Sequence, residues 1–164
     1  MEGYAVPAPF PLDSIDRTIL ASLQQDGRIT NVELARRAGL TAPPCLRRVR
    51  ALEEAKVIES YHARLNAPAL GYGIMVFAMV SLKTQAEDDL RAFERHVTGL
   101  PEVRECHMLN GEIDFILKIV AHDLQAFQTF LTSKLTPAPN VASVKTSLTI
   151  RTSKDEAGIP VDPA

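Results

Sequence analysis

The stretch ITNVELARRAGLTAPPCLRRVRALEEAKVI, residues 29–58, predicts two short helices joined by a tight turn. Thr30 followed by Glu33 indicates a capping box at the start of the first helix, and Gly39 marks its end. A helix–turn–helix with glycine in its turn is a motif that places its second helix in the DNA major groove. This stretch therefore predicts a DNA-binding domain.

The second helix of this pair is expected to be capped by Thr41 and to carry Pro43 and Pro44 in its first turn, where backbone N–H groups lack intrahelical partners. At about 100° per residue, its apolar side holds Cys45, Leu46, Val49 and Leu52. Its opposite side holds Pro44, Arg47, Arg50 and Ala51, with Arg48 beside them. The three arginines are the first candidates for DNA contact.

Further candidates for DNA contact surround this helix. Thr41, Pro43 and Pro44 lie at its N-terminus, where backbone N–H groups favour phosphate, although both prolines also fit a purely helix-starting role. The alternative for the arginines is a solvated helix face, which is the usual role of a run of charges. Weaker candidates for phosphate contact are Arg28, Asn31 and Arg64.

Charge is distributed unevenly along the 164 residues, whose formal net charge is −2. Between Arg28 and Arg50 six arginines stand against one acid, Glu33, which gives a local charge of +5. From Ala67 onward nine Lys and Arg stand against twelve Asp and Glu, a balance of −3. A basic module joined to an acidic one indicates DNA contact in the first and a different role for the second.

Other classes of protein find little support in the sequence. Cys45 and Cys106 fall in separate expected elements, which favours a reducing cytoplasm over a disulfide framework. No signal peptide is expected, and the longest apolar run, residues 74–80, is too short to cross a bilayer. Strand alternation sends Glu105 and His107 to one face and Cys106 to the other, so we expect no metal site there. No nucleophile constellation stands out, so we expect no catalytic residue.

The pattern changes near residue 70, where a proline and two glycines mark a break. Before it we expect a winged helix–turn–helix domain over residues 12–66, in which an extended piece at 59–65 forms the wing. After it we expect a second domain over residues 67–152. Residues 1–11 and 153–164 are expected to be flexible tails.

The second domain is expected to have the order β-α-β-β-α-β, the ferredoxin-like arrangement of an α+β fold. Its expected elements are strand 74–82, helix 86–98, strand 103–109, strand 113–120, helix 123–135 and strand 141–151. Asn110-Gly111 indicates a type I′ hairpin turn, which needs positive φ at both residues. Strand 74–82 is apolar on both alternating sets, so we expect one face under the helices and the other against a second copy of the chain.

Three stretches resemble the Lrp/AsnC (leucine-responsive/asparagine-synthase regulator, or feast/famine) family of bacterial regulators: LDSIDRTILASLQQDGRITNVELARRAGL (12–40), PCLRRVRALE (44–53) and ECHMLNGEIDFILK (105–118). The similarity runs from about Leu12 to Arg151. It implies a transcription regulator with a winged helix–turn–helix and an amino-acid-binding C-terminal domain. It also implies dimers that associate into octamers or similar rings.

The family resemblance further implies an amino-acid effector, leucine or another apolar one. Asp114 can bind an ammonium group and the backbone near Gly111 a carboxylate. The alternative is that Asn110-Gly111 is only a turn and Asp114 a structural cap. Met108, Leu124 and Leu148 can form the apolar lining of the amino-acid site. The full set of candidate effector residues is Met108, Asn110, Gly111, Glu112, Asp114, Leu124, Ser147, Leu148 and Thr149.

Two other functions stand beside an amino-acid-responsive regulator. One is a DNA-binding regulator that ignores small molecules and responds only to its own concentration. The other is an enzyme similar to the siroheme decarboxylases, which combine a degenerate helix–turn–helix with the same sheet. The arginines of residues 47–50 argue against the enzyme, which would not need them.

Overall fold

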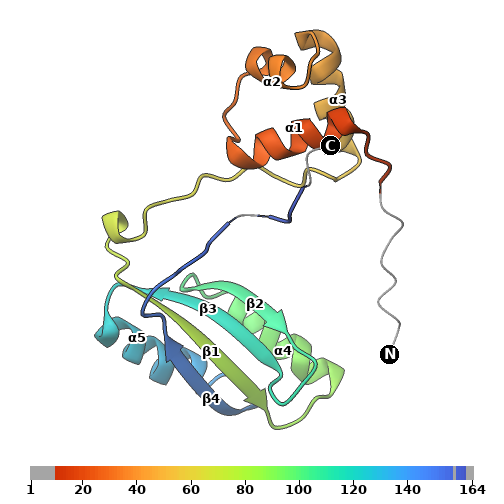
Figure 1. Ribbon diagram of the computed structural model, residues 1–164. Helices are drawn as coiled ribbons and strands as arrows, with labels where there is room; N and C mark the ends of the chain where they lie inside the picture. Colours follow the sequence, from red (N-terminus) through yellow and green to blue (C-terminus); the bar gives the residue numbers. More distant parts are fainter. Residues whose placement is uncertain (1–9, 157, 162–164) are drawn as a thin grey trace. The chain divides into compact units, whose positions relative to one another are not determined.

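The computed structural model describes residues 10–156 and 158–161, which divide into two compact units (Figure 1). The first unit includes the chain up to Arg64 together with its end from Asp155, and the second spans Leu65–Lys154. Each unit has its own apolar core. Most of the expected N-terminal arm, residues 1–9, lies outside the described residues.

The first unit contains three helices: α1 (Ser14–Gln25), α2 (Asn31–Arg37) and α3 (Ala42–Glu54). Gly39, between α2 and α3, has a φ of 67°, a left-handed conformation that glycine adopts without steric cost. The helices bury their apolar sides in one cluster, formed by Ile19, Leu20, Leu34, Ala35, Cys45, Val49 and Leu52. The expected helix pair is therefore confirmed, and so is the burial of Cys45, Val49 and Leu52 on the second helix, whereas Leu46 is only half-buried and lies outside the cluster.

The caps of α2 and α3 differ from those expected. Thr30 Oγ1 accepts a hydrogen bond from the Glu33 backbone N–H at 3.2 Å. The Glu33 carboxylate, however, binds Arg36 and Arg37 instead of returning to Thr30, so only half of the capping box forms. Thr41 is the N-cap residue of α3, as expected, but its side chain makes no capping hydrogen bond.

The segment expected to form the wing, residues 59–65, contains no strand and no helix. A short 3-10 turn, Pro68–Leu70, follows it in the second unit. The extended character of the segment was foreseen, but it forms no hydrogen-bonded β-ladder.

The end of the chain contacts the first unit, so its described part is not the free tail that was expected. Arg64 binds the backbone oxygen and the carboxylate of Asp155, at 2.8 and 2.7 Å. Gln24 Nε2 donates to the Ile159 carbonyl at 2.9 Å, and Val161 packs against the apolar cluster of the helices. An apolar side chain and two sets of polar contacts thus hold residues 155–156 and 158–161, which we call the C-terminal strap.

The second unit is a four-stranded antiparallel sheet in the order β2-β3-β1-β4, with its helices on one face (Figure 1). Its elements are β1 (Ile74–Leu82), α4 (Glu87–Thr98), β2 (Val103–Met108), β3 (Phe115–Ala121), α5 (Leu124–Phe130), a π-helical continuation (Leu131–Leu135) and β4 (Val141–Leu148). This order and topology confirm the ferredoxin-like arrangement. No helix in the described part of the chain is long and apolar enough to cross a membrane.

Strand β1 separates the two faces of the sheet. Val76, Ala78 and Val80 are buried in the core of the second unit, together with Phe93 of α4 and Phe127 of α5. The alternate residues of β1 lie on the opposite face, which no helix of the unit covers. They are only half-buried, and we call this surface the open sheet face.

The connection from β2 to β3 is longer than a two-residue turn. The strands stop at Met108 and Phe115, and the Leu109 N–H donates to the Asp114 carbonyl at 2.8 Å across the loop. Neither Asn110 nor Gly111 has positive φ, so the type I′ turn expected there was wrong. Six residues can reverse the chain without left-handed backbone, which removes the need for glycine.

Candidate functional site

The outward side of α3 presents two arginines. Arg47 and Arg50 are exposed, and neither takes part in an ion pair within residues 10–156 and 158–161. Because they are three positions apart in the sequence, they are neighbours on one side of the helix. These two guanidinium groups are available to an anionic partner.

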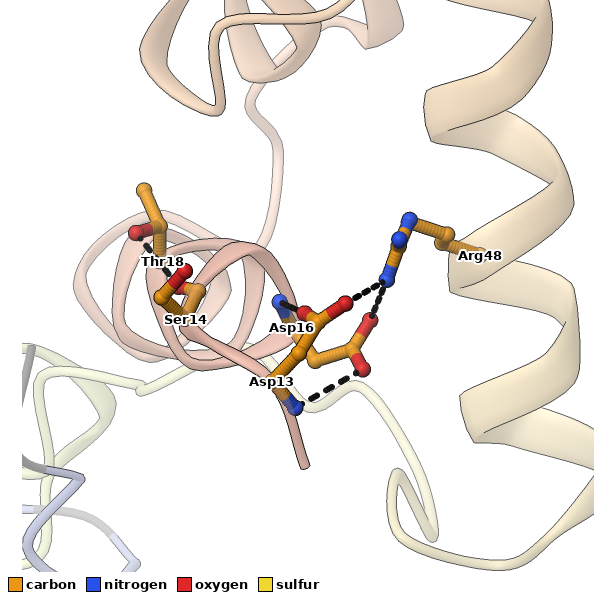
Figure 2. A network of polar contacts seen from close by, with 5 residues as sticks. All are labelled: Asp13, Ser14, Asp16, Thr18 and Arg48. Atoms are coloured by element: carbon orange, nitrogen blue, oxygen red, sulfur yellow. Dashed lines mark hydrogen bonds and ion pairs between the residues drawn. The ribbon is translucent and has the colours of Figure 1, made fainter. Parts of the chain in front are cut away.

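Arg48 is placed differently from the other two arginines of α3. Its Nη1 donates to Asp13 Oδ2 and to Asp16 Oδ1, each at 2.8 Å (Figure 2). Its side chain is 33% exposed. The sequence grouped Arg48 with Arg47 and Arg50, but the structure ties it to the start of α1.

The two acids that hold Arg48 also cap α1. Asp13 Oδ1 accepts from the Asp16 N–H at 2.8 Å, and Asp16 Oδ2 accepts from the Asp13 N–H at 3.3 Å. The Asp16 N–H and the Arg48 guanidinium hold the pKa of Asp13 below its usual range, and the two carboxylates raise the pKa of Arg48. No local signal in the sequence points to the arginine opposite these two acids.

The remaining candidates for DNA contact vary in their availability. Thr41 and Pro43 are exposed and Pro44 is half-buried, all at the start of α3. Arg28 and Asn31 are exposed as well. Arg64 is bound to Asp155 of the C-terminal strap, although 74% of its side chain is exposed.

The candidate effector residues of one chain fall into two groups at opposite ends of the sheet. Met108 pairs with Phe115, which pairs with Val80 near the end of β1. Leu148 pairs with Val76 near the start of β1. Four residues of strand, on the order of 13 Å, separate these positions. The first group is Met108, Asn110, Gly111, Glu112 and Asp114, and the second is Leu124, Ser147, Leu148 and Thr149.

Asp114 is used inside the second unit. Its Oδ2 accepts from the Leu82 N–H and its Oδ1 from Gln85 Nε2, both at 2.7 Å. Its backbone N–H donates to the Val80 carbonyl at 3.0 Å, and the residue is 8% exposed. The structure thus favours the structural-cap interpretation of Asp114 over binding of a ligand ammonium.

Several of the other candidate effector residues leave apolar surface without cover. Met108, Leu124 and Leu148 are 58%, 56% and 53% exposed. Thr149 Oγ1 is buried and has no hydrogen-bond partner. The loop residues Asn110, Gly111 and Glu112 are exposed. Both ends of the sheet therefore expose candidate effector residues that no other part of the same described chain covers.

The open sheet face is mostly apolar but carries charge on β3 and β2. Its apolar residues are Met75, Phe77, Met79, Ile116 and Val120, as the strand register places them. Lys118 lies opposite Phe77, between Ile116 and Val120, and its Nζ binds Glu105 Oε1 at 2.7 Å, which holds the pKa of Glu105 below its usual range. In the described part of the chain no group of three His, Cys, Asp or Glu side chains could hold a metal ion.

Comparisons with known proteins match both units. Residues 12–59 match the family model described as a winged helix-turn-helix DNA-binding domain, and residues 75–159 match the Lrp/AsnC ligand binding domain. The chain is 54% identical over 150 residues to a leucine-responsive regulatory protein of Rhizobium meliloti, covering 92% of this chain and 96% of that protein. It is 42% identical over 140 residues to the Bkd operon transcriptional regulator of Pseudomonas aeruginosa, covering 85% and 92%.

A solved structure is also similar. The transcriptional regulator of Neisseria meningitidis in complex with L-Met superposes with a TM-score of 0.89 at 35% identity, covering 93% of this chain and 98% of that one. Both the sequence relatives and this structure span nearly the whole chain. The similarity therefore concerns the combination of the two units and not one of them alone.

Proposed function

The chain belongs to the Lrp/AsnC family of transcriptional regulators, and we propose that it controls transcription by binding DNA through α3 and an amino acid through its second unit. It is a DNA-binding regulator and not an enzyme, because its relatives are named as regulators and its first unit matches a DNA-binding family.

The exposed pair Arg47 and Arg50 is the main observation that supports DNA binding through α3. A recognition helix reads base edges in the major groove, and arginine pairs with guanine through two hydrogen bonds. The exposed N-terminus of α3, with Thr41 and Pro43, would lie near phosphate. Arg28 and Asn31 are secondary phosphate contacts in this proposal.

The effector is an apolar amino acid, and leucine is our first choice. The exposed side chains of Met108, Leu124 and Leu148 support an apolar ligand. The Rhizobium meliloti relative is named for its response to leucine, and the Neisseria meningitidis structure contains L-methionine. These two ligands share an unbranched or γ-branched apolar side chain of similar size.

The effector site lies between copies of the chain in this proposal. One chain separates its candidate residues to opposite ends of its sheet, so a single pocket using both groups needs a second copy. Two copies bury the open sheet face as a dimer, and dimers associate further into an octamer or a similar ring. An effector that binds one assembly better than another increases the population of that assembly. It thereby changes how many α3 helices can bind one DNA molecule at the same time.

Fluorescence anisotropy with DNA from upstream of the protein's own gene tests the function, with each of the twenty amino acids added in turn. We expect tight binding that is weaker for scrambled DNA and a change in affinity with leucine, together with a change in sedimentation. Failure to prefer any DNA over its scrambled form would contradict the assignment of α3. Specific binding with no response to any amino acid would instead support the effector-independent regulator.

A further inference from the structure

We propose that Arg48 is a positioning residue, which Asp13 and Asp16 hold so that α3 keeps its orientation against α1, and that Arg48 does not itself contact DNA. The inference rests on the proposed DNA binding by α3. It departs from the grouping of all three arginines of α3 as DNA contacts.

The geometry of the bridge supports this role. One nitrogen of Arg48, Nη1, meets a carboxylate oxygen from Asp13 and another from Asp16, each at 2.8 Å. Figure 2 shows the Arg48 side chain leaving α3 and reaching across to the first turn of α1. Both acids are in turn fixed by the reciprocal capping bonds of α1, so the arginine is held by groups that cannot move independently.

Apolar packing between α1 and α3 does not provide the same constraint. The cluster joins Ile19 and Leu20 of α1 to Cys45, Val49 and Leu52 of α3. Burial of apolar surface is non-directional, so it permits small rotations and shifts of one helix on the other. Charge-assisted hydrogen bonds are short and directional. The bridge to Arg48 therefore selects one orientation of α3 among those that the cluster allows.

The orientation matters for the residues beside Arg48. With Arg48 turned toward α1, Arg47 and Arg50 remain exposed and form no ion pair with the residues that the structure describes. Arg48 therefore has an indirect part in DNA binding.

The test measures the affinity of the full-length protein for two duplexes over a range of salt concentrations. One duplex is selected by the wild-type protein from a random library, and the other is its scrambled form. The positioning variants are Arg48→Met, Arg48→Lys and Asp13→Asn. Asparagine caps a helix as well as aspartate does, so Asp13→Asn removes a charge opposite Arg48 and keeps the cap. Glu54→Gln is the matched control, because this exposed acid on α3 lies outside the bridge.

We expect Arg48→Met and Asp13→Asn both to lower the ratio of selected to scrambled affinity by about tenfold, the equivalent of one lost base-pair contact. Neither should change the slope of log affinity against log salt, because no phosphate contact is lost. Arg48→Lys, which keeps a charge between the acids, should recover part of the ratio, and Glu54→Gln should match the wild type. Thermal unfolding of each variant shows whether the fold is retained.

A salt slope reduced by about 0.9 in Arg48→Met, with unchanged discrimination in Asp13→Asn, would identify Arg48 as a phosphate contact and overturn the proposal. If Arg48→Met fails to fold, the result for Asp13→Asn tests the positioning role by itself. A carboxylate does not bind phosphate, so a loss of specific DNA binding on neutralising Asp13 can only arise through its contact with Arg48. If the wild-type protein selects no duplex, the proposed function fails instead of the positioning role.

Discussion

The buried carboxylate of Asp114 accepts a hydrogen bond from the backbone N–H of Leu82 at 2.7 Å, which joins the loop before β3 to the end of β1. We predict that Asp114→Ala lowers the free energy of unfolding by about 1–3 kcal/mol, because it leaves a buried N–H without its partner. Denaturant unfolding measures this change, with the exposed Glu112→Ala as control. If the Asp114→Ala variant has normal stability but no longer responds to leucine, Asp114 contacts the ligand instead of acting as a structural cap.

Arg47→Ala should weaken binding to a selected duplex by about 1–3 kcal/mol if it reads a base, and Arg50→Ala should do the same or reduce the salt slope. Both side chains are exposed and unpaired within the described residues, so their loss leaves the fold intact. Anisotropy titrations at several salt concentrations measure both effects. Arg36→Ala is a control on α2, because Arg36 is bound to Glu33. Equal affinity for all three variants and the wild type would contradict the role of α3.

Substitutions in β1 should separate assembly from folding. Phe77→Asp and Met79→Asp lie on the open sheet face and should give folded monomers, because a charge cannot be buried there without a partner. Val76→Asp and Val80→Asp place the charge in the core and should unfold the second unit. Analytical ultracentrifugation and circular dichroism distinguish the two results. A wild-type protein that sediments as a folded monomer at micromolar concentration would rule out the dimer.

Glu33 should give the first unit a small dependence on pH. Hydrogen bonds from Arg36 and Arg37 lower the pKa of Glu33 to about 2. Because the pKa is lower in the folded chain, the contribution is complete above the ordinary glutamate pKa and is lost as the pH falls toward 2. Glu33→Gln should therefore be slightly less stable than the wild type at pH 7, with a difference that shrinks below about pH 4.5. Thermal unfolding at low salt, repeated in high salt to screen the pairs, measures it; a difference that persists unchanged at pH 2.5 would argue against the ion pairs.

The C-terminal strap should stabilise the first unit. Val161→Ser removes an apolar contact with the helix cluster and should lower the unfolding temperature. Ile159→Ser is the matched control, because its side chain is 74% exposed and only its backbone carbonyl bonds to Gln24. Equal unfolding temperatures for the two variants would show that the strap contributes nothing through Val161.

Regular elements could be predicted well because their signals are local. The bounds of β1 agree with those expected, and those of α4 and β2 differ by one residue, since apolar periodicity and turn residues mark them. The inward direction of Cys45, Val49 and Leu52 on α3 was also correct, because side-chain direction on a helix follows from spacing alone.

Contacts between distant residues could not be predicted in the same way. A helical wheel places Arg48 beside Arg47, but it contains no information on the two acids that lie 32 and 35 positions earlier. Asn110-Gly111 favours a type I′ turn only if the strands continue up to it, and here they stop earlier. The partners of Asp114, like the contacts of the C-terminal strap, depend on how the chain closes on itself.

The return of the chain to its first unit has a consequence for synthesis. Helices α1, α2 and α3 leave the ribosome before the second unit, while Val161 and the carbonyl that Gln24 binds are translated after it. The DNA-binding half of the protein therefore reaches its final packing only after the whole second unit has been translated. A chain that stops within the second unit therefore lacks the contacts that Arg64, Gln24 and the helix cluster make with residues 155, 159 and 161.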